Sequence, residues 1–257
     1  MSGNPSAWDP GRLDPVKAAE FAAYTGGHDL RPVFLHAGYL INLSCRSGRN
    51  AIIHERSIKL LQTNIDRARE LGCEQVVFHA GSRRGTGAEE ALAALLDGIA
   101  RLDARGVTLL IENGAGAGET ACSRFEELAL VLDAAAARGL GAPLGVCLDT
   151  AHLWGAGYDL TSAAAARRVV DEFDRLVGAG RLRLIHINDS PLERGSLRDR
   201  HEHIGKGGIP LAGLGALVRD RRFGEVPLIM ETPGAGNPSD EERMRDLIEL
   251  ASTASRS

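Results

Sequence analysis

Six apolar segments of the sequence end on, or next to, a side chain that could bind a metal ion. These side chains are His36, His79, Glu112, Asp149, His186 and Glu231. The loops just beyond them add three more, His152, Asp199 and His201. Imidazole nitrogens and carboxylate oxygens without thiolates suit zinc, manganese or iron rather than a structural cysteine site. Each residue alone would more often be structural, but the whole set predicts a metal centre.

Charge favours more than one metal ion in such a centre. Four of the nine side chains are carboxylates, so three divalent cations would leave a net charge of +2. A positive centre would attract a phosphodiester and stabilise its transition state, whereas a single divalent ion would leave a negative site. Basic residues also follow the apolar segments, at Arg46, Arg49, Arg83, Arg84, Arg194, Arg198, Arg200 and Lys206. They are either solvated surface charges or a ring that holds a DNA backbone.

The elements that must position these residues alternate regularly along the chain. Strands are expected at residues 32–36, 75–79, 107–113, 146–149, 182–189 and 227–232. Helical periodicity predicts helices at residues 16–24, 56–71, 88–105, 124–138, 163–177, 211–219 and 240–251, and His152 is expected in a glycine-rich loop. Strands that are apolar on both faces belong to a parallel sheet covered by helices. We therefore predict a (β/α)8 barrel or part of one, with its site at the carboxyl ends of the strands.

Bulk properties fit this prediction and exclude some classes of function. A chain of 257 residues is ordinary for a one-domain barrel, so residues 1–257 are expected to form one domain with a frayed tail at 252–257. With a net charge of −4 the chain as a whole is not basic, so any contact with nucleic acid must be local or assisted by metal ions. The four cysteines contain no C-x-x-C pair, which argues against a disulfide framework or a zinc knuckle. The sequence has neither a leader nor an apolar run near 18 residues, so we expect a cytoplasmic protein with no membrane partner.

Seven segments, in order, resemble endonuclease IV, the zinc-dependent apurinic/apyrimidinic (AP) endonuclease. They are HAGYLINL, FHAGS, IENGAG, GVCLDTAHLWGAGYDL, HINDS, DRHEHIGKGGI and LIMET. The resemblance implies a TIM barrel with three zinc ions per chain. One ion would be held by His36, His79 and Glu112. A second would share Glu112 and add Asp149, His186 and Glu231, and the third would be held by His152, Asp199 and His201.

The resemblance also implies a reaction and a partner. A monomer would hydrolyse the phosphodiester 5′ to an abasic site in double-stranded DNA and leave a 3′-hydroxyl. A hydroxide bridging the first two ions would be the nucleophile, and Glu112, Asp149 and Glu231 would be the catalytic carboxylates. DNA contacts would come from Tyr39, Leu40, Arg198, Arg200 and Lys206. Tyr39 and Leu40 match a loop that opens the duplex, although packing on the barrel rim is an equally good interpretation of them.

Two departures from the family pattern leave other hypotheses open. The family has two further strands and a helix before the segment matched by residues 4–8, so six strands of an N-terminally shortened barrel are expected here. Ser6 and Ala7 stand where some members carry a long basic side chain. A sugar isomerase or epimerase of the same barrel type would need only a set like Glu112, Asp149, His186 and Glu231. An inactive remnant that binds DNA is the third hypothesis, and metal content separates the three.

Overall fold

The computed structural model describes residues 6–234 together with residues 242, 245, 246, 249 and 252. Contacts divide the chain into two compact units. The first unit consists of Met1–Glu112, Glu119–Ala121 and Leu130–Gly145, and the second of Asn113–Gly118, Cys122–Ala129 and Val146–Ser257. Each unit contains parallel strands alternating with helices. The expectation of a single domain therefore stays a prediction.

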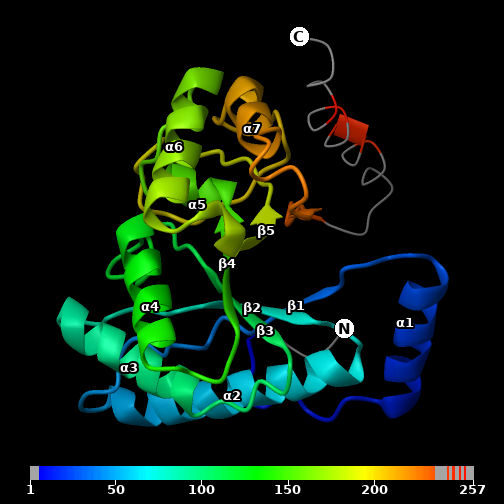
Figure 1. Cartoon of the computed structure of the whole chain (residues 1–257), viewed down its shortest axis with the longest axis vertical. Helices are drawn as coiled ribbons and strands as arrows, with labels where there is room; N and C mark the ends of the chain where they lie inside the picture. The colour runs from blue at the N-terminus through cyan, green and yellow to red at the C-terminus, as the bar shows by residue number, and fades with distance from the viewer. Residues whose placement is uncertain (1–5, 235–241, 243–244, 247–248, 250–251, 253–257) are drawn as a thin grey trace. The chain divides into compact units, whose positions relative to one another are not determined.

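The first unit is a parallel sheet with helices packed on it. Its strands are β1 (Phe34–His36), β2 (Gln75–His79) and β3 (Thr108–Glu112), with β2 in the middle. The middle residues of β2 and β3 are completely buried. The helices are α1 (Pro15–Gly27), α2 (Asn50–Glu70) and α3 (Ala88–Ala100), and Figure 1 shows α2 and α3 running beneath the strands.

Local sequence signals explain why two of these helices form. Asp14 caps α1, since its side chain accepts the backbone N–H of Val16 at 2.9 Å, and Pro15 occupies the first helical position, where no N–H is needed. The buried residues of α2 include Leu61, Ile65 and Ala68, which recur at helical spacing. This spacing gives α2 one apolar face to bury.

The second unit repeats the same arrangement. Its strands are β4 (Leu144–Asp149), whose first two residues belong to the first unit, β5 (Leu182–His186) and β6 (Leu228–Ile229), all parallel. Its helices are α5 (Thr150–Gly155), α6 (Ala163–Leu176), the 3-10 helix η1 (Ala179–Arg181) and α7 (Leu211–Val218). Helix α4 (Phe125–Ala137) begins in the second unit and continues in the first.

Aromatic side chains form part of the core of the second unit. Phe173 of α6 meets Phe125 and Phe223 edge to face, with ring centroids 5.2 and 5.7 Å apart. Edge-to-face pairs of this kind add to the free energy gained from burial. The Tyr158 hydroxyl accepts the backbone N–H of Phe125 at 2.9 Å, so the start of α4 is fixed to the loop that precedes α6.

Several element boundaries differ from the sequence-based predictions. Helix α2 begins at Asn50 rather than at residue 56, and α3 ends at Ala100 rather than at residue 105. Gly106, with φ of +88°, lies in the turn between α3 and β3. His152 lies in the short helix α5, not in a loop. The helix predicted at residues 240–251 and the tail at 252–257 fall largely outside the described residues, and no described helix is long and apolar enough to cross a membrane.

Candidate metal centre

The first unit gathers three of the predicted ligands where its strands end. His36 ends β1, His79 ends β2 and Glu112 ends β3. Glu112 Oε2 lies 2.9 Å from His36 Nε2 and 3.5 Å from His79 Nε2. One ligand atom from each of the three residues lies within 4.8 Å of the others. The group has the composition and spacing of a metal site.

Sheet register and one backbone contact orient these three side chains. His79 and Glu112 are direct partners in the β2–β3 ladder, so both leave the sheet at the same level. The Nδ1 atom of His36 donates to the Ala37 carbonyl oxygen at 2.8 Å, which directs its Nε2 atom toward Glu112. Metal-binding histidines commonly fix their second ring nitrogen in this way. Glu112 is buried, whereas the side chains of His36 and His79 are about a quarter exposed.

The second unit gathers another group at the end of β4 and in the loop after β5. Asp149, His152 and His201 bring ligand atoms within 4.8 Å of one another. Asp199 Oδ1 lies 3.2 Å from His152 Nε2 and 3.2 Å from His201 Nε2. Ligand atoms about 2.0–2.2 Å from a tetrahedral zinc ion would be about 3.3–3.6 Å apart. The spacing around Asp199 therefore approaches that of a bound zinc ion.

Hydrogen bonds at the far side of each ring fix the tautomers of these histidines. His152 Nδ1 donates to the Asn113 carbonyl oxygen at 2.9 Å, and His201 Nδ1 donates to the Glu231 carbonyl oxygen at 3.1 Å. Both Nε2 atoms therefore face the centre of the group. His201 Nε2 is buried and lies 3.2 Å from Asp199 Oδ1 and 3.6 Å from Asp149 Oδ2. A buried nitrogen aimed at neighbouring carboxylates fits a metal ion as its intended partner.

The same geometry shifts the pKa values of two members. Partial desolvation favours a higher pKa for Asp199, but the adjacent imidazoles of His152 and His201 outweigh it and hold that pKa below its ordinary value. Burial lowers the pKa of His201, but the carboxylates of Asp199 and Asp149 raise it more, to about 9. The group thus strongly favours positive charge next to its carboxylates.

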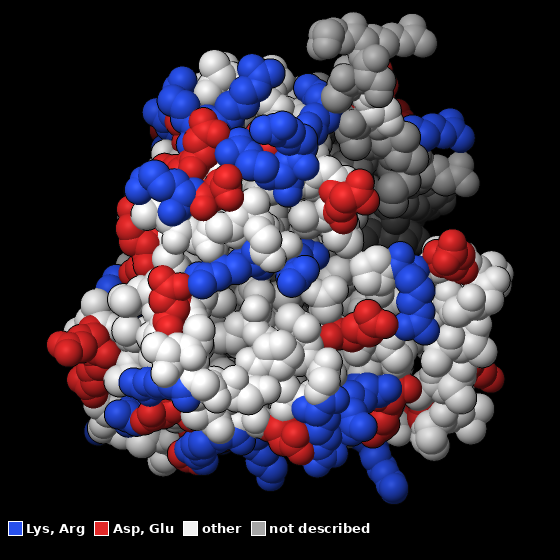
Figure 2. Space-filling view, viewed as in Figure 1, with Lys and Arg blue, Asp and Glu red and all other residues white. Residues whose placement is uncertain are grey.

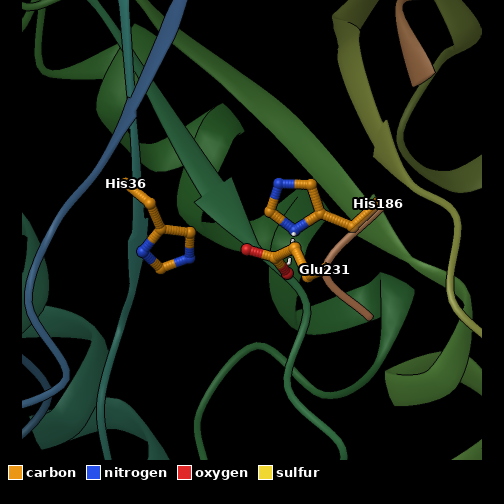
Figure 3. A group of neighbouring side chains, drawn as sticks. All are labelled: His36, His186 and Glu231. Atoms are coloured by element: carbon orange, nitrogen blue, oxygen red, sulfur yellow. Dashed lines mark ion pairs between the residues drawn. The ribbon is translucent and has the colours of Figure 1, made fainter. Parts of the chain in front are cut away.

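A third set of contacts joins β5 to the segment that follows β6. His186 Nδ1 lies 3.0 Å from Glu231 Oε2 (Figure 3) and 4.0 Å from Asp149 Oδ2. Asp149 and His186 are direct partners in the β4–β5 ladder, which explains their proximity. Glu231 lies two residues after β6, not within a strand. The predicted bridge from Glu112 to these residues joins different units and stays a prediction.

Two buried asparagines support Asp149, and the sequence reading did not single them out. Asn113 Oδ1 accepts the Asp149 backbone N–H at 2.7 Å. Asn188 Nδ2 donates to Asp149 Oδ2 at 2.6 Å, and Asn188 Oδ1 accepts the Glu231 backbone N–H at 2.8 Å. Asn113 directly follows Glu112 in IEN, and Asn188 lies two residues after His186 in HIN. An amide at the end of a predicted strand was the only sequence signal.

The candidate DNA-contacting residues differ in their surroundings. Tyr39 is 70% exposed and Leu40 is half-buried, and Arg198, Arg200 and Lys206 are all exposed. Two other members of the predicted basic ring are engaged in ion pairs, Arg46 with Asp97 and Arg194 with Asp159. Acidic and basic side chains lie interspersed on the face shown in Figure 2. The predicted basic ring has members in both units and stays a prediction.

Comparisons with known proteins agree with this geometry. A profile of the xylose isomerase-like TIM barrel family matches residues 2–253. A protein of Natronomonas pharaonis named "Probable endonuclease 4" is 36% identical over 96% of this chain and 88% of its own length. Its namesake from Natranaerobius thermophilus is 35% identical over 96% of this chain and 86% of its own length.

Solved structures give the same result and confirm the predicted fold class. The crystal structure of endonuclease IV from Thermus thermophilus superposes with a TM-score of 0.83 and 33% identity, covering 99% of this chain and 88% of that one. A D-tagatose 3-epimerase-like protein, with a TM-score of 0.68 and 18% identity over 92% of this chain and 83% of its own, shares the fold alone. This chain belongs to the endonuclease IV family and has the xylose isomerase-like TIM-barrel fold.

Proposed function

We propose that this chain is a zinc-dependent AP endonuclease of DNA repair. It would hydrolyse the phosphodiester 5′ to an abasic site in double-stranded DNA and leave a 3′-hydroxyl. The observation that carries the proposal is the gathering of histidine and carboxylate ligands, in both units, at the ends of parallel strands. The name of the relatives, endonuclease 4, supports the same reaction class.

The residues divide into three proposed ion sites. His36, His79 and Glu112 would hold one zinc ion, and His152, Asp199 and His201 a second. Asp149, His186 and Glu231 would hold the third. Zinc is favoured because imidazole nitrogens and carboxylate oxygens make up the donor set, without thiolates.

Bound zinc would supply positive charge for the phosphate and lower the pKa of water so that it attacks at neutral pH. The protein would hold the ligands in place through the hydrogen bonds of Asn113, Asn188 and the backbone carbonyls. Side chains already fixed before the substrate arrives need no reorganisation during the reaction. Glu112, Asp149 and Glu231 are the proposed catalytic carboxylates.

Tyr39 is the proposed contact with the lesion. Its ring is largely exposed, beside the neighbouring ring of His36 at a centroid distance of 6.5 Å. An exposed aromatic side chain can enter a base step and stack there, at an unstacking cost of a few kcal/mol. The low pairing and stacking of an abasic nucleotide reduces that cost. Arg198, Arg200 and Lys206 would contact phosphates.

Cleavage of a duplex carrying a tetrahydrofuran abasic analogue tests the proposal. Zinc-loaded protein is expected to nick only the lesion strand, 5′ to the analogue, and to contain about three zinc ions per chain. Glu112→Gln is expected to bind the duplex but not to nick it. His28→Gln is the matched control, because His28 is exposed and lies outside both ligand groups. Absence of nicking by the zinc-loaded chain would overturn the proposal, and a single manganese ion with sugar isomerisation would replace it.

A further inference from the structure

Asp189 is a completely buried carboxylate that is not one of the nine predicted ligands. It lies just after β5, next to Asn188. Each of its two carboxylate oxygens accepts two backbone N–H groups. Oδ1 accepts those of Ser190 at 2.7 Å and Ile209 at 2.9 Å, and Oδ2 accepts those of Gly205 at 3.0 Å and Gly207 at 2.9 Å. Three of these four donors come from one later loop, residues 199–209, called the ligand loop below.

The backbone of Asp189 also binds the ligand loop near its start. The Asp189 N–H donates to the Glu202 carbonyl oxygen at 3.2 Å, and the Glu202 N–H donates to the Asp189 carbonyl oxygen at 2.8 Å. The preceding residue, His201, and Asp199 lie in the metal-ligand group of the second unit. The ligand loop is therefore attached to Asp189 at both ends, with two predicted metal ligands beside the first attachment.

The ligand loop needs such an anchor because it contains neither helix nor strand. Gly205, Gly207 and Gly208 lie within four residues of each other, and ordering glycine loses more backbone entropy than ordering any other residue. A Cβ atom at Gly207 would overlap the Asp189 carboxylate and the Ser190 carbonyl oxygen. Glycine at position 207 thus allows the backbone to approach the carboxylate. The hydrogen bonds to the carboxylate in turn hold the flexible loop in one conformation.

We propose that Asp189 is a positioning residue that fixes the ligand loop so that Asp199 and His201 reach the same ion as His152. This inference rests on the proposed function, because it assigns Asp189 a role in that zinc site. A carboxylate suits the position because both of its oxygens accept N–H donors. An asparagine of the same shape would direct an NH₂ group at two of the four N–H groups. The charge and acceptor capacity of Asp189, rather than its volume, are therefore required.

Asp189→Asn tests this role without changing side-chain size. The variant is expected to retain about two of three zinc ions per chain, measured by elemental analysis after gel filtration. In the metal-free protein, trypsin is expected to cut after Arg200 or Lys206 at least ten times faster than in the parent chain. Gly207→Ala, which keeps the carboxylate but displaces the loop, is expected to give the same two changes.

Asp220→Asn is the matched control. Asp220 lies in the same unit and accepts the Arg222 N–H at 3.1 Å and its guanidinium at 2.8 Å, outside the ligand groups. This variant is expected to lose stability but to keep three zinc ions and the parent trypsin rate. Three zinc ions and parent protease resistance in Asp189→Asn would overturn the inference while leaving the proposed function intact.

If neither loop variant folds, hydrogen exchange on the metal-free parent chain tests whether Asp189 fixes the ligand loop. The amides of Gly205, Gly207 and Ile209 are expected to be protected, because each donates to a buried carboxylate. Exchange at the unprotected rate in all three would overturn the inference. Failure of the parent chain to bind zinc or to nick abasic DNA would instead overturn the proposed function. The exchange result would still show whether Asp189 orders the ligand loop.

Discussion

Asp149 is held from two sides by asparagine side chains that are distant in sequence. Asn113 accepts its backbone N–H and Asn188 donates to its carboxylate, across separations of 36 and 39 residues. The ligand types could be predicted because chemistry limits which side chains bind zinc. The supporting amides could not, since an asparagine after a strand has many uses and only the folded chain shows which one applies.

Replacing Asn188 by alanine should weaken metal binding as well as stability. The variant would leave the Asp149 carboxylate and the Glu231 N–H without this buried partner, a loss of about 2–4 kcal/mol in the free energy of unfolding. Removing a group that orients metal ligands commonly lowers metal affinity by about 10–100-fold. Urea unfolding and zinc competition with a chromophoric chelator measure the two effects.

Asn64→Ala is the matched control for this prediction. Asn64 is also buried, and its side chain donates to the Leu60 carbonyl oxygen within α2 at 2.8 Å. The control should lose stability and keep the zinc affinity of the parent chain. Unchanged zinc affinity in Asn188→Ala would contradict the orienting role.

Burial should also make the Cys73 thiol slow to react. Burial raises the pKa of Cys73 to about 11 from its ordinary 9.0, and nearby Arg31 offsets this only in part. The reactive thiolate at pH 8 should then be about 100-fold less abundant in the folded chain than in the unfolded chain. Because the folded-state pKa is raised, the contribution of this group to stability should be lost as pH rises from about 9 to about 11.

Iodoacetamide labelling at pH 8, followed by mass spectrometry of the Cys73 peptide, checks this expectation. The folded chain should be labelled far more slowly than the same chain in urea. Equal labelling rates in the two states would show that the thiol is not protected. Cys73 is a buried free cysteine that follows α2 and is not one of the predicted ligands, so the result should not depend on added zinc.

At the scale of elements, a single residue accounts for the unexpected helix α5. Asp149 caps it, since its Oδ1 accepts the His152 N–H at 2.8 Å, while its other oxygen accepts from Asn188. Composition predicted a loop because the segment is rich in glycine, but the cap satisfies an N–H group that would otherwise lack a partner. The short helix turns the His152 ring toward the Asn113 carbonyl oxygen. The positions of strand ends were thus easier to predict than the element that follows them.

Helix α7 offers a matched pair of glycines that tests packing. A Cβ atom at Gly213 would overlap the Leu160 carbonyl oxygen, which is backbone and cannot move alone. A Cβ atom at Gly215 would meet only the far end of the Arg219 side chain. Gly213→Ala should therefore destabilise the protein by about 1–3 kcal/mol. Gly215→Ala should be neutral or stabilising by up to about 1 kcal/mol, since alanine favours helix.

Urea unfolding of the two variants beside the parent chain measures these differences. The pair shares one helix and one substitution, so helix propensity cancels in the comparison. Equal stability of the two variants would show that α7 does not pack tightly against the segment that contains Leu160.

At the scale of the molecule, the alternation of strands and helices was predictable and the compact units were not. Continuous apolar runs identify β2, β3 and β4, because the central residues of these strands are buried on both faces. Boundaries were less predictable, because Gly106 matches a helix stop and acts instead in the turn before β3. The division at Glu112 and Asn113 depends on contacts across the whole chain, which no local pattern contains.

Removing zinc should destabilise the whole protein. Glu112 and Asp149 are buried carboxylates within proposed ion sites, and a bound cation stabilises the folded state alone. Zinc at about 1,000 times its dissociation constant would contribute about 4 kcal/mol per site. For a chain of this size, that contribution corresponds to roughly 8–16 °C in Tm.

Thermal melts before chelation, after chelation and dialysis, and after zinc is restored measure this contribution. The Tm should fall on chelation and recover with zinc but not with magnesium, because magnesium binds imidazole nitrogen poorly. The His28→Gln variant should show the same fall, since His28 lies outside the ligand groups, whereas His79→Ala should show a smaller one. Identical melting curves with and without chelator would mean that the ligand groups are satisfied without metal, and the proposed zinc sites would be wrong.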